Sequence, residues 1–192
     1  MFAVLLRAVS RNIKQLFCNL SDANFYQAAL KINKGFIMAS PILFTLPDAE
    51  NNVFKVAEHL PLIVYFYPKD STPGCTTEAQ EFSLLLPQFQ ELGFSIVGIS
   101  RNSVKSHQQF VCKYELNVTL LADVDSAVCR QFDVIKEKNN YGKKVLGIER
   151  STFVLNQQGE IIQEWRKVRA AGHAQMVLDW VRSYQSADKQ PK

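Results

Sequence analysis

A cysteine with polar neighbours is the first feature of this sequence that could carry chemistry. Cys75 follows Thr72-Pro73-Gly74 and separates an apolar run at 61–67 from a pattern that predicts a helix. A helix begins with unpaired backbone N–H groups and the positive end of its dipole, and both stabilise an anion. The thiolate is the reactive form of cysteine. The position therefore favours an activated thiol, although a small residue in a tight turn fits it equally well.

The neighbours of Cys75 could assist such a thiol. The Thr72 hydroxyl, three residues earlier, can donate a hydrogen bond to a bound oxygen or accept one from it. Pro68 and Pro73 stiffen the loop, so that its polar groups need little reorganisation during a reaction. Gly74 lets a ligand approach the backbone closely. The segment 68–75 is therefore the candidate active site.

The spacing Pro68-x-x-x-Thr72-x-x-Cys75 resembles the active-site signature of the peroxiredoxins. The stretch 65–78, with 133–138 and 147–153, is similar to the Q-type subgroup, also called bacterioferritin comigratory proteins. This resemblance spans residues 41–182. It implies thiol-dependent reduction of hydrogen peroxide and organic hydroperoxides to water and alcohols, in antioxidant defence and cell redox homeostasis. It also implies recycling by thioredoxin or a glutaredoxin-like dithiol protein, and no metal or organic cofactor.

The resemblance also assigns roles to single residues. Cys75 matches the peroxidatic cysteine, Thr72 the hydroxyl that contacts the peroxide, and Arg150 the arginine beside the thiolate. Pro68 would shield the site. In this chemistry the thiolate attacks one peroxide oxygen and becomes a sulfenic acid, which is the reversible first stage of cysteine oxidation. Considered alone, Arg150 would be interpreted as a solvated charge at the end of a strand.

A second cysteine must reduce the sulfenic acid if the catalytic cycle is internal. Many Q-type proteins carry it five residues after the first cysteine, where this chain has Gln80. Others carry it on the following helix, and Cys112 is within one residue of that position. We rank Cys112 first, no internal resolving cysteine second, and Cys129 third. The apolar neighbours of Cys129 predict a buried, inert thiol.

Composition limits the class of protein. The chain has 192 residues and four cysteines, which fits one globular domain with an extension and free thiols in a reducing compartment, the cytoplasm. The formal net charge of +4 comes from residues 1–37, because the other 17 basic and 17 acidic residues cancel. The neutral remainder argues against nucleic-acid binding. No apolar stretch is long enough for stable membrane insertion, and Q-type resemblance together with the neutral surface favours a monomer.

The first 37 residues allow three interpretations. Residues 1–17 have apolar side chains at helical spacing, basic residues and no acidic residue. This pattern is typical of a transit peptide, which would imply organelle targeting, and of a helix that lies on an anionic membrane. Alternatively, translation begins at Met38. We slightly favour the third interpretation, with a domain at 38–192, because the compact pattern begins there.

The order of predicted elements indicates an α/β, thioredoxin-like fold. We expect a central mixed sheet flanked by helices on both faces and preceded by an N-terminal β-hairpin. The hairpin is predicted at 42–46 and 53–56, and a charged loop at 135–147. The remaining strands are predicted at 62–67, 94–99, 118–121, 150–155 and 161–168, and helices from 76, at 103–116, 126–132 and 172–184.

Two other functions fit the same residues. A redox sensor or holdase would oxidise once and change partners, and turnover with thioredoxin would distinguish it. A thiol–disulfide oxidoreductase is disfavoured because the chain has no Cys-x-x-Cys pair. The three histidines, His59, His107 and His173, are expected at the surface rather than as general bases.

Overall fold

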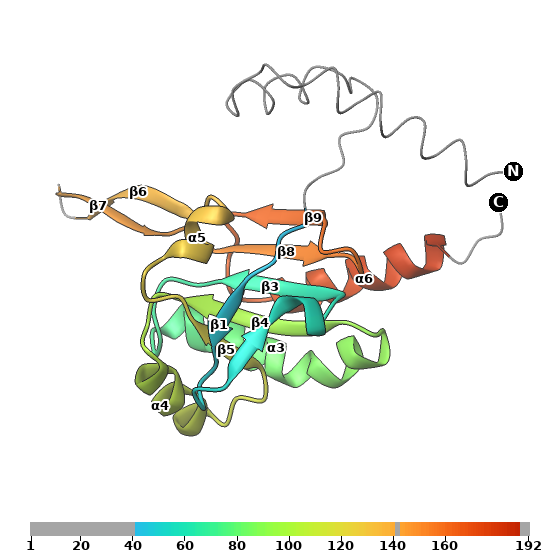
Figure 1. Ribbon diagram of the computed structural model, residues 1–192, viewed down its shortest axis with the longest axis horizontal. Coiled ribbons are helices and arrows are strands. Elements are labelled where there is room, and N and C mark those ends of the chain that lie inside the picture. The colour runs from blue at the N-terminus through green and yellow to red at the C-terminus, as the bar shows by residue number, and fades with distance from the viewer. Residues whose placement is uncertain (1–40, 141–142, 189–192) are drawn as a thin grey trace, which may run out of the picture. The chain divides into compact units, whose positions relative to one another are not determined.

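The structure is a computed structural model that describes residues 41–140 and 143–188 (Figure 1). A five-stranded mixed sheet forms its centre, in the order β5-β4-β3-β8-β9. Parallel pairs join β3 (Leu62–Phe66), β4 (Ser95–Ser100) and β5 (Thr119–Ala122), whereas β8 (Ser151–Leu155) and β9 (Ile161–Arg166) add antiparallel pairs. The predicted mixed α/β sheet is confirmed.

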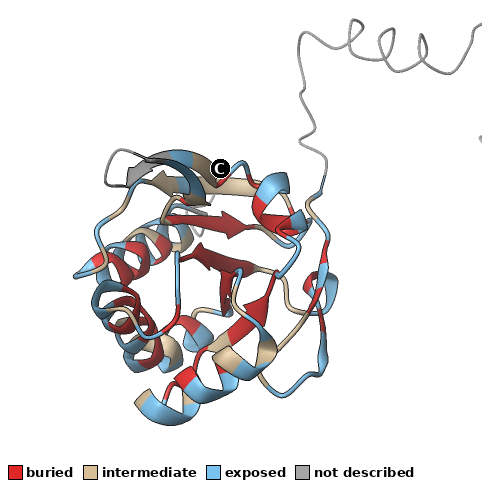
Figure 2. Ribbon diagram, turned by 90° about the vertical axis from the view of Figure 1, so that its left-hand side faces the viewer, coloured by how far each residue is buried: buried red, intermediate tan, exposed pale blue. Residues whose placement is uncertain are grey.

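Strand β3 lies at the middle of the sheet because its side chains are apolar on both faces. All five residues are buried, and alternate side chains point to opposite faces. Ile63 and Tyr65 pack in one core cluster with the long helices α3 (Pro73–Glu91), α4 (Val104–Tyr114) and α6 (His173–Asp188). Figure 2 shows the buried strands in red and the helices with their buried sides turned inward.

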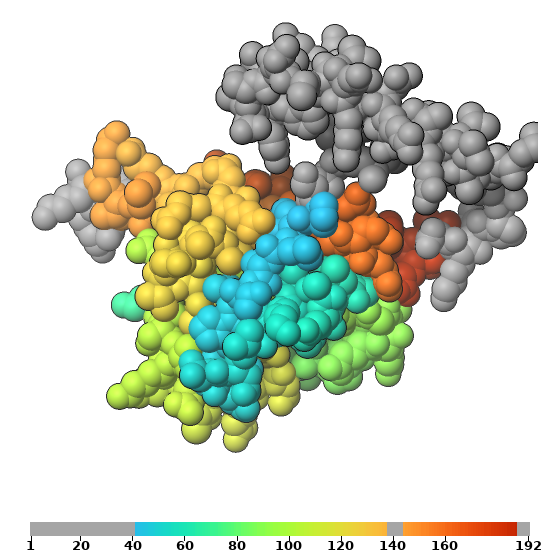
Figure 3. Space-filling view, viewed as in Figure 1, coloured from blue at the N-terminus to red at the C-terminus, as the bar shows by residue number. Residues whose placement is uncertain are grey.

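The opposite face of the sheet is covered differently. Leu62, Val64 and Phe66 pack there with the hairpin of β1 (Thr45–Pro47) and β2 (Val53–Lys55) and with the short helix α5 (Ala127–Gln131). On the molecular surface the blue segment around β1 lies beside the yellow segment around α5 (Figure 3). The helices therefore flank the sheet unequally, since all three long ones lie on one face.

The N-terminal hairpin is present in a shorter form than predicted. Its strands pair antiparallel over three residues each, and the 3₁₀ turn η1 (Val56–Glu58) follows. The Asp48 carboxylate closes the turn by accepting hydrogen bonds from the backbone N–H groups of Glu50 and Asn52, both at 2.8 Å. The hairpin also contacts the central sheet, because Asp48 forms an isolated antiparallel β-bridge with Leu121 of β5.

The prediction of a charged loop at 135–147 is wrong. This segment forms a second hairpin, β6 (Ile135–Asn140) and β7 (Lys143–Ile148), in a separate two-stranded sheet. Exposed Val145 and Leu146 show that much of β7 is not covered by the core. Of the β7 side chains that the structure describes, only Ile148 at the end of the strand is buried. A strand without a continuous buried face needs no apolar alternation, so the sequence carried no periodic signal.

The start of α3 also differs from the prediction, which placed it near Thr76. The helix begins at Pro73, with Thr72 as its N-cap residue. Proline suits the first helical position because that position needs no N–H donor. The helix ends at Glu91, and Gly93 follows it with a φ of 75°, a conformation that glycine adopts readily.

The predicted division at residues 37 and 38, and the amphipathic pattern of 1–17, lie outside the described residues. In the described ranges, no helix combines the length and hydrophobicity that crossing a bilayer requires.

The close packing of Gly98 against Tyr65 gives a stability prediction. A Cβ on Gly98 would lie 2.4 Å from Cζ and 2.5 Å from the hydroxyl oxygen of Tyr65. We expect Gly98→Ala to lower the free energy of unfolding by about 1–3 kcal/mol in urea denaturation, because the overpacked core must shift. Ser95→Ala, on the same strand, serves as control. If Gly98→Ala lowered the free energy of unfolding by the same amount in the wild type and in Tyr65→Leu, the contact between Gly98 and Tyr65 would be contradicted.

Candidate active site

Cys75 lies in the first turn of α3, directly after the loop that follows β3. Only 1% of its surface is exposed. The position combines the carboxyl end of a central parallel strand, where ligand sites gather in α/β sheets, with the positive end of a helix dipole. The predicted environment of the Cys75 sulfur, at a helix N-terminus, is therefore present.

Arg150 provides the principal charge beside this sulfur. Its Nη2 atom donates a hydrogen bond to Cys75 Sγ at 3.2 Å. The contact joins residues far apart in sequence because β8 pairs with β3, and the pair Phe66–Ser151 places Arg150 just beyond the end of β3. A guanidinium at this distance stabilises the thiolate over the thiol. Arg150 is thus a partner of Cys75 and not a solvated strand-end charge.

Glu78 is a site residue that the sequence reasoning missed. Its carboxylate is fully buried, and Oε2 accepts a hydrogen bond from Nη1 of Arg150 in an ion pair. Burial raises the pKa of Glu78 to about 7, against the lowering effect of Arg150. Glu78 stands three residues after Cys75, so both lie on one face of α3. That spacing is the sequence signal that could have identified it.

The guanidinium of Arg150 therefore lies between two groups that can be anionic. Burial lowers its pKa, but Glu78 and Cys75 raise it above the usual value overall. Arg150 stays charged across the physiological range. Because Glu78 holds one nitrogen and the other faces Cys75, the ion pair orients the hydrogen bond to sulfur.

Thr72 and Pro68 occupy the loop before α3. The Thr72 hydroxyl is half-buried and donates a hydrogen bond to the carbonyl oxygen of Lys69 at 3.0 Å. Its oxygen lone pairs can still accept a hydrogen bond. Pro68 is exposed. The contact of Thr72 with peroxide and the shielding by Pro68 stay predictions.

The two candidate resolving cysteines have different environments. Cys112 is an exposed free thiol on α4. It lines a shallow cavity of about 620 Å³ together with Ser71, which belongs to the loop before Cys75. Cys129 is completely buried, and burial raises the pKa of its thiol, helped by Asp123. A thiol with a raised pKa is a poor nucleophile, so the geometry favours Cys112 over Cys129.

The expectation that the histidines lie at the surface is wrong for two of the three. His107 is fully buried and His173 nearly so. His173 Nε2 lies 2.8 Å from the Thr152 hydroxyl oxygen, and burial together with Arg150 lowers the pKa of His173 to about 4. His59 is partly exposed and stacks on Phe54, with ring centroids 4.1 Å apart.

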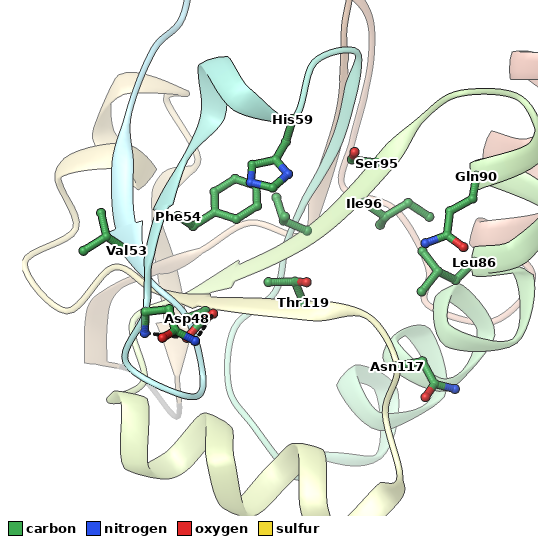
Figure 4. A pocket seen from close by; sticks show the side chains of 12 residues that line it. Asp48, Val53, Phe54, His59, Leu86, Gln90, Ser95, Ile96, Asn117 and Thr119 are labelled. Atoms are coloured by element: carbon green, nitrogen blue, oxygen red, sulfur yellow. Dashed lines mark hydrogen bonds between the residues drawn. The ribbon is translucent and has the colours of Figure 1, made fainter.

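A separate cavity of about 430 Å³ lies away from Cys75 (Figure 4). Ser95 and Thr119, which line it, begin β4 and β5, so the cavity is at the amino ends of strands whose carboxyl ends face the Cys75 side. His59 and Asp48 also line it, but the Asp48 carboxylate already accepts hydrogen bonds from its own turn. We assign no chemistry to this cavity. The described ranges contain no cluster of three metal-binding side chains.

Comparison with known proteins agrees with this site. Residues 40–164 match the model of the AhpC/TSA family. A similar relative, Peroxiredoxin Bcp of Xanthomonas campestris, is 61% identical over 117 residues, which are 61% of this chain and 73% of the relative. A putative peroxiredoxin bcp of Coxiella burnetii is 45% identical over 138 residues, covering 71% of this chain and 91% of the relative.

A solved structure of the Xanthomonas campestris bacterioferritin comigratory protein is also similar. It superposes with a TM-score of 0.71 at 48% identity, over 76% of this chain and 98% of that chain. That structure belongs to a set of trapped intermediate and ligand complexes that address the alkyl peroxide reduction activity of that protein. Solved structures of cysteine-to-serine mutants of Xanthomonas campestris peroxiredoxin Q match equally well, at TM-scores of 0.71.

The opposed pKa shifts of Glu78 and His173 predict an unusual pH dependence. Glu78 titrates higher in the folded chain than in the unfolded chain, so its stabilising contribution is complete below about pH 4.3 and is lost as pH rises to about 7. His173 titrates lower when folded, so its contribution is complete above about pH 6.5 and is lost as pH falls to about 4. Between these limits the two effects oppose each other.

We therefore expect Glu78→Gln to remove the contribution of Glu78 to the pH dependence of the free energy of unfolding. Relative to the wild type, the free energy of unfolding of the variant should rise between pH 5 and 6.5, by at most about 1.4 kcal/mol per pH unit. Urea denaturation at several pH values measures it, with Glu81→Gln as the control carboxyl on the same helix. Parallel pH curves for Glu78→Gln and the wild type would show that Glu78 ionises at its ordinary pKa.

Proposed function

This chain belongs to the AhpC/TSA family, the peroxiredoxins, and we propose that Cys75 is its peroxidatic cysteine. The protein is a thiol peroxidase of the Bcp/Q type. The observation that carries the proposal is the hydrogen bond from Arg150 to Cys75 Sγ at the N-terminus of α3. It places a fixed positive charge beside a sulfur that also has a helix dipole behind it.

The proposed reaction begins with the Cys75 thiolate. Its sulfur attacks one oxygen of the hydroperoxide in line with the O–O bond, which breaks. A sulfur–oxygen bond forms, and the departing oxygen leaves as water or an alcohol once it takes a proton. Negative charge grows on that oxygen, and hydrogen-bond donors from Arg150 and the start of α3 stabilise it. The Thr72 oxygen can accept a hydrogen bond from the O–H group of the hydroperoxide. Cys75 is left as a sulfenic acid.

We propose that Cys112 resolves this intermediate. Its sulfur attacks Cys75 Sγ, a disulfide forms, and the sulfenic hydroxyl leaves as water with the thiol proton. The exposure of Cys112 and the cavity that it shares with Ser71 support this assignment. Because Cys75 is buried, the first turn of α3 must open before the sulfurs meet. A thioredoxin-type dithiol then reduces the disulfide.

We further propose that the protein works as a monomer in the reducing cytoplasm. The described cysteines, Cys75, Cys112 and Cys129, are all free thiols, which fits a reducing compartment. The names of the relatives indicate a peroxide substrate and leave the preferred hydroperoxide open. The contribution of residues 1–37 to targeting stays a prediction.

Substitution of the two central residues tests the function. Cys75→Ser should abolish hydroperoxide turnover in a thioredoxin-coupled assay while the thermal midpoint changes little. Arg150→Gln should slow the oxidation of Cys75 about 100-fold, because one charged donor to the developing negative charge is lost. Stopped-flow mixing with hydrogen peroxide measures this step. Persistent turnover in Cys75→Ser would refute the proposal.

Cys129→Ser is the matched control for Cys75→Ser. Cys129 is also buried, but it has no guanidinium hydrogen bond and its thiol pKa is raised by burial. Its replacement should leave turnover unchanged. A loss of turnover in Cys129→Ser alone would identify Cys129 as the reactive thiol.

A further inference from the structure

A buried hydrogen-bond network joins the loop before Cys75 to the helix that carries Cys112. Its centre is Asp70, which is 7% exposed. The carboxylate accepts hydrogen bonds from the Tyr67 hydroxyl at 2.8 Å and the Ser106 hydroxyl at 2.6 Å. His107 Nδ1 lies 3.0 Å from Asp70 Oδ2. Ser106 and His107 belong to the first turn of α4, so the network connects α4 to the Cys75 loop.

Both ring nitrogens of His107 have polar partners inside the protein. Nδ1 faces the Asp70 carboxylate and also lies 3.3 Å from the Tyr67 hydroxyl oxygen, and Nε2 lies 3.2 Å from the carbonyl oxygen of Leu121 in β5. Burial raises the pKa of Asp70, but the hydrogen bonds from His107 and Ser106 lower it below its usual value overall. Asp70 and His107 therefore form a buried hydrogen-bonded pair, and separating it would leave buried polar groups without partners.

Each residue of this hydrogen-bonded pair precedes a cysteine by the same number of residues. Asp70 precedes Cys75 by five residues, and His107 precedes Cys112 by five residues. Five extended residues span about 17 Å. If the helical residues after Asp70 and after His107 unwind, both sulfurs can move toward each other while the hydrogen-bonded pair remains in place.

We propose that the hydrogen-bonded pair of Asp70 and His107 stays closed during resolution and positions Cys75 and Cys112 for disulfide formation. The inference rests on the proposed role of Cys112. Asp70 and His107 are then positioning residues, since they touch neither the peroxide nor the sulfurs. Resolution itself joins the Cys112 sulfur to Cys75 and releases the sulfenic hydroxyl as water, so no further reactant is needed.

The hydrogen-bonded pair shortens the flexible chain segments that lead from a fixed point to each cysteine. Without it, the next fixed points before the cysteines are Phe66, at the end of β3, and Ser100, at the end of β4. These lie nine and twelve residues before Cys75 and Cys112. The flexible chain between the sulfurs then roughly doubles, which makes ring closure about threefold less probable.

The test separates the two chemical steps in time. We would mix reduced protein with one equivalent of hydrogen peroxide and follow Cys75 oxidation by stopped flow and disulfide formation by quenched-flow intact mass. His107→Leu should form the Cys75–Cys112 disulfide about threefold more slowly, with Cys75 oxidation within twofold of the wild type. Lys105→Leu, an exposed change on the same helix, is the control and should alter neither step.

Ser106→Ala is a second, milder variant, because it removes one donor to Asp70 from a half-buried position. It should slow the disulfide step less than His107→Leu does, and it decides the outcome if His107→Leu does not fold. Unchanged or faster disulfide formation in a folded variant would overturn the proposal. If the wild type forms no Cys75–Cys112 disulfide, the resolving role of Cys112 fails and the proposal fails with it.

Hydrogen exchange on the oxidised protein gives an independent measure. The amide of His107 donates to the Ser103 carbonyl in the first turn of α4. In the disulfide form this amide should stay protected, whereas the amides of residues 108–114 should lose protection. Loss of protection at His107 as well would show that the hydrogen-bonded pair opens, and would overturn the proposal.

Discussion

The contact between Arg150 and Cys75 is the interaction on which the rest of the site depends. A buried sulfur is a poor place for a negative charge unless a cation compensates it. Arg150 supplies that cation at 3.2 Å, and Glu78 anchors its other nitrogen. The site is thus a row of three groups: the buried Glu78 carboxylate, the Arg150 guanidinium and the Cys75 sulfur. Cys75 is the member of the row that follows the loop holding Thr72.

The fold produces this row through strand pairing and not through local sequence. The antiparallel pairing of β8 with β3 places Arg150 at the start of α3, and the buried side chains of β3 hold that register on both faces of the sheet. A shift by one residue would turn Arg150 away from Cys75 and would exchange the side chains that fill the cores on the two faces of the sheet. Stability of the core and reactivity of the thiol are therefore coupled.

Local patterns were enough to predict the central strands, the position of Cys75 and, through the family resemblance, Arg150. They failed where side chains act across distance. His107 looked like a surface residue because its helical neighbours are polar, yet Asp70 and the Leu121 carbonyl satisfy it inside the protein. The hairpin at β6 and β7 was missed because neither strand needs a fully buried face. Glu78 had a usable signal, its helical spacing from Cys75, but burial raises its pKa only in the folded chain.

The most direct test of this account is to oxidise the reduced protein with one equivalent of hydrogen peroxide, then measure its intact mass and a peptide map without reductant. The account predicts a cross-link between Cys75 and Cys112, with Cys129 unmodified. Retention of oxygen on Cys75 without a cross-link would contradict the two-cysteine cycle and require an external thiol. Unmodified Cys75 alongside oxidised Cys112 or Cys129 would contradict the central claim that Arg150 activates Cys75.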